Sequence, residues 1–366
     1  MLKKTVLLLT LFLLLGIMLV SPGLCIEAAS SGLLLWFNKV LPSLLPFIIL
    51  VNLLVSSDSL VYLQSAMNKW TQKLWGLPGG SFLSFILGLI AGYPMGAKVT
   101  KELYEKNYLS LKEAQKTLCF TNNCGPLFIV GTVGTLLLHN TSLGYFLLFI
   151  HFLSALILSL CLRSLPLSSR VHKTAFIQAK MSPSFATLFN EAVKGAMDTI
   201  VYVGAYIIFF SVLVHLLLEG LPPLIQSFHL PVSSNLRLFA CLLELSNGVN
   251  SICQASLPLQ SCLPQISFIL GFGGLCVYFQ TSYVLEDAPF SLIPYFFCKL
   301  AQGLLGLLLT EALYPFWLWQ KEKKPLYFPI YWWCSLLFFV SLLTLLVHLL
   351  GYKTSYFKKS HIFSNK

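Results

Sequence analysis

The sequence predicts an all-α polytopic membrane protein with about eight transmembrane helices and two re-entrant half-helix hairpins, arranged as an inverted repeat. The chain of 366 residues is 57% hydrophobic and only 10% charged, whereas soluble domains carry about 25% charged residues. Apolar runs of about 20 residues, the length that crosses a hydrocarbon core, recur along the chain. Two shorter apolar runs end in polar, glycine-containing breaks. Lipid is therefore the expected solvent for most of the chain.

The apolar runs divide the chain into five parts. Residues 1–32 hold the pair Lys3 and Lys4 and an apolar stretch, which we interpret as a transmembrane anchor rather than a cleaved signal peptide. The rest divides into a first repeat at 33–162, a basic cytoplasmic connector at 163–198, a second repeat at 199–318, and a last transmembrane helix with a basic tail at 319–366.

Full-length spans and interrupted helices alternate within these parts. Pro42 and Pro46 predict a kink or break in the second span, because proline lacks the N–H group that a helix interior uses. Glycines and polar residues interrupt two further helices, at 119–138 and 265–285. The predicted full-length spans lie at 33–55, 143–162, 199–218, 290–318 and 327–350.

Two apolar pieces are too short to cross a membrane. Phe82–Ala91 ends in the break Gly92–Gly96, and Leu236–Leu245 ends in the break Ser246–Asn250. At a rise of about 1.5 Å per residue each piece reaches only about half of the core. If both pieces enter the membrane and return, 18 of the 24 lysines and arginines fall on one side. The positive-inside rule then places both termini in the cytoplasm of a bacterial cell with the protein in its inner membrane.

Polar residues beside these breaks predict a substrate site near the middle of the membrane. Inverted repeats with broken helices place such sites there, because half-helix ends expose unpaired backbone groups. Glycines also serve close helix packing, which is the alternative explanation, but polar neighbours are costly against lipid. The candidate substrate-binding residues are Gly92, Tyr93, Pro94, Gly96, Asn122, Asn123, Gly125, Glu244, Ser246, Asn247, Asn250, Gly273, Gly274 and Gln280.

Glu244 and the two asparagines are the candidates with the most specific chemistry. Asn122 and Asn123 precede the apolar helix 127–138, where free N–H groups favour an anion or a carbonyl, and simple helix capping is the alternative. Glu244 lies between two leucines, and an intramembrane carboxylate is a candidate proton or cation carrier or substrate partner. Its alternative role is a structural ion pair with Lys299.

Neither an enzyme nor a nucleic-acid-binding protein is indicated. No catalytic triad or metal-ligand spacing surrounds the candidate residues, so we expect no enzymatic activity, cofactor or metal. The net charge of +11 resides in short connectors without a basic face interleaved with aromatic residues. The expected partners are therefore a small-molecule substrate and the lipid bilayer.

Four stretches resemble the sporulation integral membrane proteins of endospore-forming bacteria, which carry a nucleoside-recognition ("Gate") domain: Leu34–Phe47, Ser84–Lys98, Asn122–Gly131 and Phe272–Gln280. The resemblance covers about residues 33–318. The two hairpins and the region of Glu244 are also similar, more distantly, to the core of concentrative nucleoside transporters, in which re-entrant hairpins and broken helices hold the substrate.

The resemblance implies a role late in spore formation, in the mother-cell membrane around the forespore. It links the chain to the spore cortex and to movement of dipicolinic acid, a planar dicarboxylate that two helix N-termini would suit. Our first hypothesis is therefore a transporter of a small polar or anionic metabolite. The alternative is a non-transporting scaffold or assembly factor, in which the basic connectors bind sporulation membrane partners or lipid headgroups. A homo-oligomer is compatible with both hypotheses.

Overall fold

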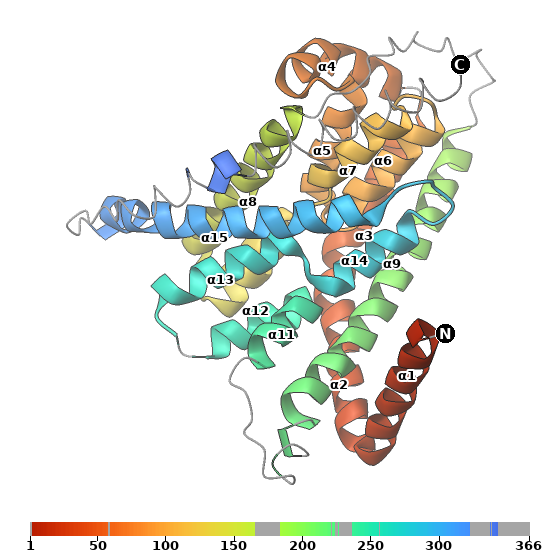
Figure 1. Ribbon diagram of the computed structural model, residues 1–366. Helices are drawn as coiled ribbons and strands as arrows, with labels where there is room; N and C mark the ends of the chain where they lie inside the picture. Colours follow the sequence, from red (N-terminus) through yellow and green to blue (C-terminus); the bar gives the residue numbers. More distant parts are fainter. Residues whose placement is uncertain are drawn as a thin grey trace, which may run out of the picture.

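The computed structural model describes residues 2–57, 59–164, 184–220, 222–223, 226, 236–255, 257–322, 337 and 339–342, and every regular element in these ranges is a helix (Figure 1). The elements are α1 (Leu2–Val20), α2 (Pro22–Leu35), η1 (Trp36–Val40), α3 (Leu41–Ser56), α4 (Ser59–Trp75), α5 (Gly79–Ala91), α6 (Met95–Glu105), α7 (Leu111–Thr121), η2 (Leu127–Leu137), α8 (Thr141–Cys161), η3 (Leu162–Ser164), α9 (Phe185–His215), η4 (Leu216–Gly220), α11 (Leu236–Leu243), α12 (Leu245–Gln254), α13 (Leu259–Phe272), α14 (Gly274–Val284) and α15 (Leu292–Glu322).

The all-helical, multi-pass membrane class is confirmed. In the described part, five helical segments are long and apolar enough to cross a membrane: Pro22–Ser56, Thr141–Ser164, Phe185–Gly220, Leu259–Val284 and Leu292–Leu318. Helices α4 and α5 meet at a bend of 91° and would add a sixth if they formed one span. The five long segments therefore correspond to five of the roughly eight predicted crossings, and the bent pair contains Phe82–Ala91, which was predicted as a re-entrant half-helix. Most of the span predicted at 327–350, the basic tail, and connector residues 165–183 lie outside the described residues.

The proline-containing second span is not broken. Helical residues run without interruption from Pro22 to Ser56, and Trp36–Val40 form a π-helical turn just before Pro42. A π-helical turn is a local widening that can accommodate an irregularity in the hydrogen-bond ladder. Helix α9 also differs from its prediction, because it begins at Phe185, inside the range assigned to the connector, after Ser184 caps its first turn.

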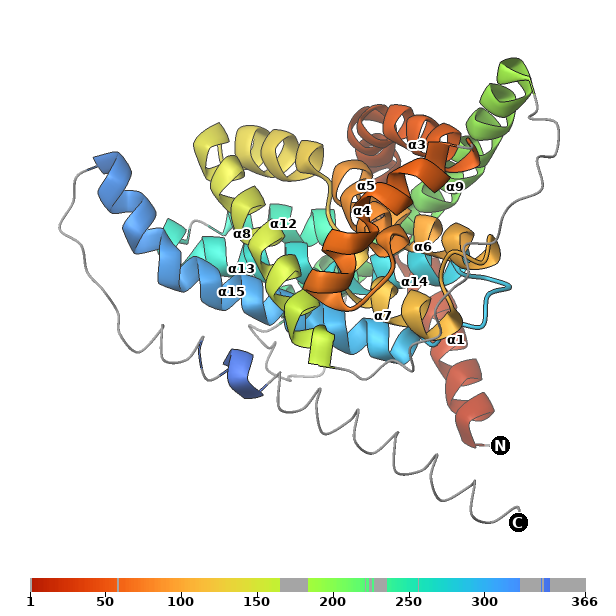
Figure 2. The ribbon, with the colours of Figure 1, turned by 90° about the horizontal axis from the view of Figure 1, so that it is seen from above.

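The long helices do not all run in one direction. In Figures 1 and 2 α15 extends across the molecule with α13 packed along it, whereas α9 runs beside α2 and α3 in a different direction. Both α9 and α15 contain 31 residues, a length of about 46 Å that exceeds a hydrocarbon core of about 30 Å. Such helices can cross a membrane only with tilt or with ends that project from it.

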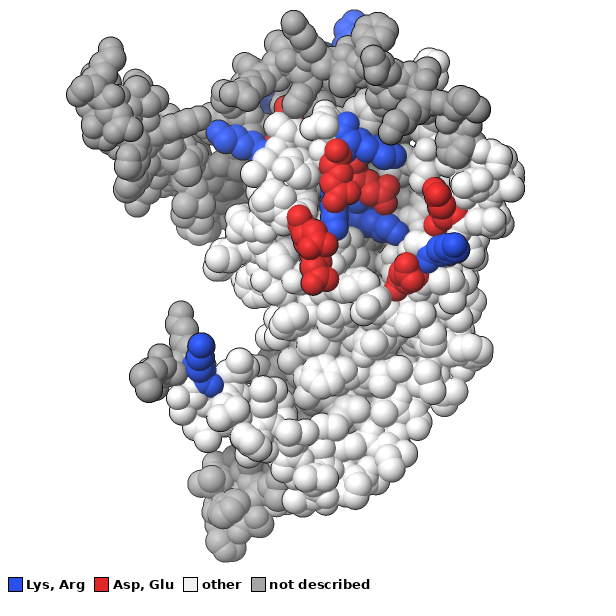
Figure 3. Space-filling view, turned by 90° about the vertical axis from the view of Figure 1, so that its right-hand side faces the viewer, with Lys and Arg blue, Asp and Glu red and all other residues white. Residues whose placement is uncertain are grey.

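Charged side chains gather toward one end of the molecule. Figure 3 shows most of them in the upper part of one face, above a broad surface without charge. The cluster comes from α6, α9 and the segment after α14, and it includes Lys98, Lys101, Glu102, Glu105, Asp198, Glu286 and Asp287. The uncharged surface below it suits lipid, and the charged end suits the water interface.

Two apolar cores lie on either side of the broken helices. One core joins residues of α3, α5, α6 and α9, such as Ile48, Met95 and Ile200. The other joins residues of α7, α8, η2, α12, α13 and α15, such as Phe120 and Leu270. The chain breaks of the predicted site lie where these two cores meet.

Candidate functional site

Four chain breaks form the site. The first separates α5 from α6 at Gly92–Pro94, where Gly92 has φ +82°, a conformation that favours glycine. The second is the extended stretch between Thr121 and Pro126, and the third separates α13 from α14 at Gly273, with φ +83°. These positions agree with the glycine-rich interruptions predicted from the sequence.

The fourth break lies at Glu244, which corrects the prediction for this hairpin. The sequence placed the break at Ser246–Asn250, but these residues form the first turns of α12. Glu244 is the N-cap residue: its carboxylate oxygens accept hydrogen bonds from the backbone N–H groups of Ser246, at 3.0 Å, and Asn247, at 2.7 Å. A side-chain acceptor at the N-cap satisfies N–H groups that the helix leaves free, so α12 starts directly after Glu244.

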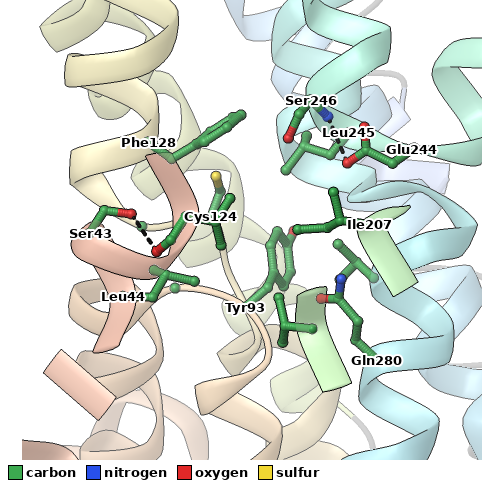
Figure 4. A pocket seen from close by; sticks show the side chains of 15 residues that line it. Ser43, Leu44, Tyr93, Cys124, Phe128, Ile207, Glu244, Leu245, Ser246 and Gln280 are labelled. Atoms are coloured by element: carbon green, nitrogen blue, oxygen red, sulfur yellow. Dashed lines mark hydrogen bonds between the residues drawn. The ribbon is translucent and has the colours of Figure 1, made fainter. Parts of the chain in front are cut away.

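A small cavity of about 60 Å³ lies between the breaks (Figure 4). In Figure 4 the ring of Tyr93 stands between Ser43 and Leu44 of α3 on one side and Glu244, Ser246 and Gln280 on the other. The residues that line the cavity are Val40, Ser43, Leu44, Gly92, Tyr93, Cys124, Gly125, Phe128, Val203, Ile207, Glu244, Leu245, Ser246, Val277 and Gln280. Six of the fourteen residues predicted from the sequence therefore share one cavity: Gly92, Tyr93, Gly125, Glu244, Ser246 and Gln280.

The walls of the cavity combine apolar side chains with a few polar groups. The carboxylate of Glu244 is only 2% exposed and Gln280 only 4%. The hydroxyl of Tyr93 donates to the carbonyl oxygen of Leu270, at 3.1 Å, and so links the first hairpin to the end of α13. A partly open, mostly apolar space with a few converging polar groups is the usual form of a small-molecule site.

The remaining predicted residues do not line the cavity, and most of them make structural contacts at or beside the breaks. Pro94 follows Tyr93 through a cis peptide bond at the hairpin tip, and Gly96 packs against the backbone at Thr121. Asn247 donates from its side chain to Ser211 on α9, at 2.8 Å. Asn250 accepts a long hydrogen bond from Gln254, at 3.4 Å, and Gly274 adopts φ +80° beside Gly273.

The side chains of Asn122 and Asn123 do not cap the following helix, which was the alternative considered from the sequence. The Asn122 amide donates to the hydroxyl of Thr281, at 2.9 Å, and to that of Tyr295, at 2.8 Å. The Asn123 amide donates back to the carbonyl of Phe120, at 2.8 Å. Both side chains are fully buried. The asparagines therefore join the end of α7 to α14 and α15, and neither caps η2.

Lys299 completes a polar network around the second break. Its ammonium donates to the carbonyl of Asn122, at 2.7 Å, and to the side chain of Gln302, at 2.6 Å. Gln302 in turn donates to the side-chain oxygen of Asn123, at 2.8 Å. The ion pair of Lys299 with Glu244 considered from the sequence is thus absent from the contacts of the described residues. Gln302 and Tyr295 were not among the candidates from the sequence, although their spacing with Lys299 places all three on one helix face.

His151 supports the same break from α8. The backbone N–H of Cys124 donates to Nε2 of His151, at 3.1 Å. Nε2 of this buried imidazole therefore acts as the acceptor and carries no proton. Neither His151 nor the cavity residues Ser43 and Phe128 were among the candidates from the sequence. A lone histidine or phenylalanine in an apolar helix carries no signal of its own, because its partner lies on another helix.

The chain is similar to a sporulation membrane protein. It is 29% identical to the sporulation integral membrane protein YlbJ of Bacillus subtilis (strain 168) over 345 residues, which cover 86% of this chain and 85% of the relative. The chain matches no protein-family model, and no solved structure matches it. The expected resemblance to a sporulation integral membrane protein is therefore confirmed over most of the chain.

Replacing Asn123 by alanine is expected to destabilise the protein by about 2 kcal/mol, because Gln302 and Phe120 would lose their buried partner. The matched control is Asn250→Ala, which removes only a long hydrogen bond to Gln254 on an exposed part of α12. Thermal unfolding of the purified variants in detergent measures the stability of each relative to wild type. Equal transition temperatures for the two variants would show that the buried network contributes little.

Proposed function

We propose that this chain is a transporter-like membrane protein that moves a small polar or anionic metabolite through the cavity between its broken helices. The observation that carries the proposal is the meeting of all four breaks around, or directly behind, one buried cavity. Broken helices that converge on a closed site are the usual construction of secondary transporters. The role we propose is transport and not enzymatic turnover.

The structure represents one state of the proposed transport cycle, in which the cavity is small. A volume of about 60 Å³ is well below the roughly 300–1,000 Å³ of pockets that hold drug-sized ligands. A larger solute requires the hairpin tips at Tyr93 and Glu244 to separate, which is the kind of movement that alternating access uses. Glu244 now occupies the N-terminus of α12 with its own carboxylate, so a solute anion would have to replace it there. We propose that this exchange is part of solute binding.

Sporulation is the physiological setting that we propose. The similarity to YlbJ, a sporulation integral membrane protein, supports it, and dipicolinic acid, which the family resemblance implied, is the first solute to test. We further propose the Gate-type inverted repeat at 33–162 and 199–318, with both termini in the cytoplasm of the mother cell. Sporulation membrane proteins or a second copy of the chain are the proposed partners. Deletion of the gene in its own organism is expected to reduce the yield of heat-resistant spores.

Transport is tested with purified protein reconstituted in lipid vesicles. The vesicles should take up radiolabelled dipicolinate, or another member of a panel of nucleosides, amino acids and small dicarboxylates, faster than empty vesicles. Gln280→Leu removes a polar group from the cavity wall at similar volume, and we expect uptake to fall about tenfold. The matched control is Gln72→Leu, an exposed position on α4, which should transport like wild type.

The scaffold hypothesis makes the opposite predictions. If no solute of the panel enters vesicles that contain inserted protein, transport of these classes is contradicted. Neutralising the lysines between Lys98 and Lys116 would then be expected to impair spore formation, while Gln280→Leu would leave it intact. The two series of variants therefore separate the two functions in one organism.

A further inference from the structure

The ammonium of Lys299 is buried among oxygen atoms of neutral groups. Lys299 is 1% exposed. Its Nζ contacts the carbonyl oxygen of Asn122, at 2.7 Å, Oε1 of Gln302, at 2.6 Å, and Oδ1 of Asn123, at 3.5 Å. The two short contacts and the long one to Asn123 offer an acceptor to each of the three hydrogens of an ammonium group. The contacts in the described part of the chain therefore fit the charged form without a carboxylate partner.

A lysine in this environment needs a reason beyond packing. A buried charge without an ionic partner carries a desolvation cost that neutral acceptors offset only in part. A leucine or methionine at this position of α15 would avoid that cost. Ionisable groups inside membrane proteins are for this reason functional candidates.

The oxygen atoms around Lys299 resemble those of a monovalent cation site. Asn122 is the C-cap residue of α7, and its carbonyl belongs to the extended stretch before η2. In secondary transporters, carbonyls of unwound stretches and of half-helix C-termini bind the coupling Na⁺ or H⁺. The negative end of the α7 dipole adds to the attraction. One carbonyl and two amide oxygens thus face a positive charge that the chain itself supplies.

We propose that the Lys299 ammonium is a tethered cation that occupies the cation site of this broken helix and makes transport independent of Na⁺. The ammonium lies 5.2 Å from the ring centroid of Tyr93, and that ring also lines the solute cavity. The fixed charge is thus separated from the solute by one aromatic ring, in the geometry of a cation–π contact. The independence of transport from Na⁺ rests on the proposed function, whereas the occupation of the cation site by the ammonium does not.

Sodium binding by purified variants tests the ion site without transport. Lys299→Ala removes the tethered charge and leaves space beside the three oxygens, so this variant should bind radiolabelled sodium saturably. Its transition temperature should rise by about 3 °C when Na⁺ replaces choline at equal ionic strength. Lys299→Met is the matched control: it also lacks the charge, but its side chain fills the space. Wild type and Lys299→Met should neither bind sodium nor respond to the exchange.

Two results would overturn the proposal. One is Lys299→Ala protein that binds no sodium and unfolds at the same temperature in both salts, as a merely structural lysine predicts. The other is sodium binding by wild type equal to that of Lys299→Ala. If Lys299→Ala does not fold, Lys299→Ser, whose hydroxyl can bond to the Asn122 carbonyl, carries the same expectations. If neither variant yields folded protein even in sodium-containing medium, sodium does not replace the ammonium, and the proposal is again contradicted.

Uptake into vesicles completes the test. Wild-type uptake should be the same within error when choline replaces Na⁺ on both sides, and a severalfold dependence on Na⁺ would contradict the proposal. If the vesicles take up no solute at all, the proposed function fails, while the sodium-binding comparison of Lys299→Ala with Lys299→Met still decides the nature of the ion site. The two failures are therefore distinguishable.

Discussion

Glu244→Gln protein is expected to lose at least about nine-tenths of wild-type solute uptake and to unfold several degrees lower. Each carboxylate oxygen of Glu244 accepts one backbone N–H, from Ser246 and from Asn247. Glutamine has only one oxygen, and its NH₂ group would face the second N–H. Loss of a charge-assisted, buried hydrogen bond costs about 1.5–3 kcal/mol, which is about 10- to 100-fold in an equilibrium constant.

The experiment compares uptake and thermal unfolding of the same reconstituted or purified preparations. The matched control is Glu105→Gln, a change of the same chemistry at an exposed carboxylate that is 3.8 Å from Lys101. A surface ion pair of this kind contributes little, so the control should behave like wild type. Glu244→Asp retains a carboxylate at the N-cap and should keep most of the stability. Wild-type uptake by stable Glu244→Gln protein would remove Glu244 from the proposed mechanism.

Gly96→Ala is expected to destabilise the protein by about 3 kcal/mol or more, or to prevent folding, because the new methyl group would overlap backbone. A Cβ atom at Gly96 would lie 2.0 Å from the carbonyl oxygen of Thr121 and 2.7 Å from Cα of Asn122. Backbone atoms cannot rotate away as a side chain can. The hairpin of α5 and α6 would therefore have to move off the second break, and the cavity would change with it.

The control for this change is Gly131→Ala on η2. Apart from the backbone of its own helix and its chain neighbours, no atom of the described residues would lie within 4 Å of a Cβ at Gly131. Alanine also favours helical structure over glycine by up to about 1 kcal/mol. Its transition temperature should equal or exceed that of wild type, measured with the Gly96→Ala protein in the same detergent. A Gly96→Ala protein as stable as Gly131→Ala would mean that the close approach of α6 to Thr121 is not required.

The sequence predicted the breaks better than the contacts between them. Gly92, Pro94, Pro126 and Gly273 interrupt helices for reasons that lie within a few residues, namely a backbone conformation open to glycine or a missing N–H group. The break at Glu244 was placed two residues too late. A glutamate between leucines has the pattern of a helix interior, and only its bonds to the next turn reveal it as a cap.

The roles of the polar residues depended on distant partners. Asn122 and Asn123 precede an apolar helix and a proline, so helix capping or ligand binding were the natural interpretations. Their bonds run instead to Thr281, Tyr295 and Gln302, more than 150 positions away. The spacing of Tyr295, Lys299 and Gln302 on one face of α15 was visible in the sequence. It showed that the three residues share a face, but not which other chain segment they contact.

The amino-acid sequence alone was enough to infer that this chain is a helical membrane protein, that several of its helices are interrupted, and that glycine-rich or polar segments mark the interruptions. These properties follow from hydrophobicity and from local backbone chemistry, which each segment carries with it. The three-dimensional packing was needed to show that the breaks meet at one cavity, that the Glu244 carboxylate caps α12, and that the Lys299 ammonium donates to oxygen atoms beside the end of α7. Those facts depend on the packing of helices far apart in the chain, and a buried polar group takes whichever partner that packing brings within reach.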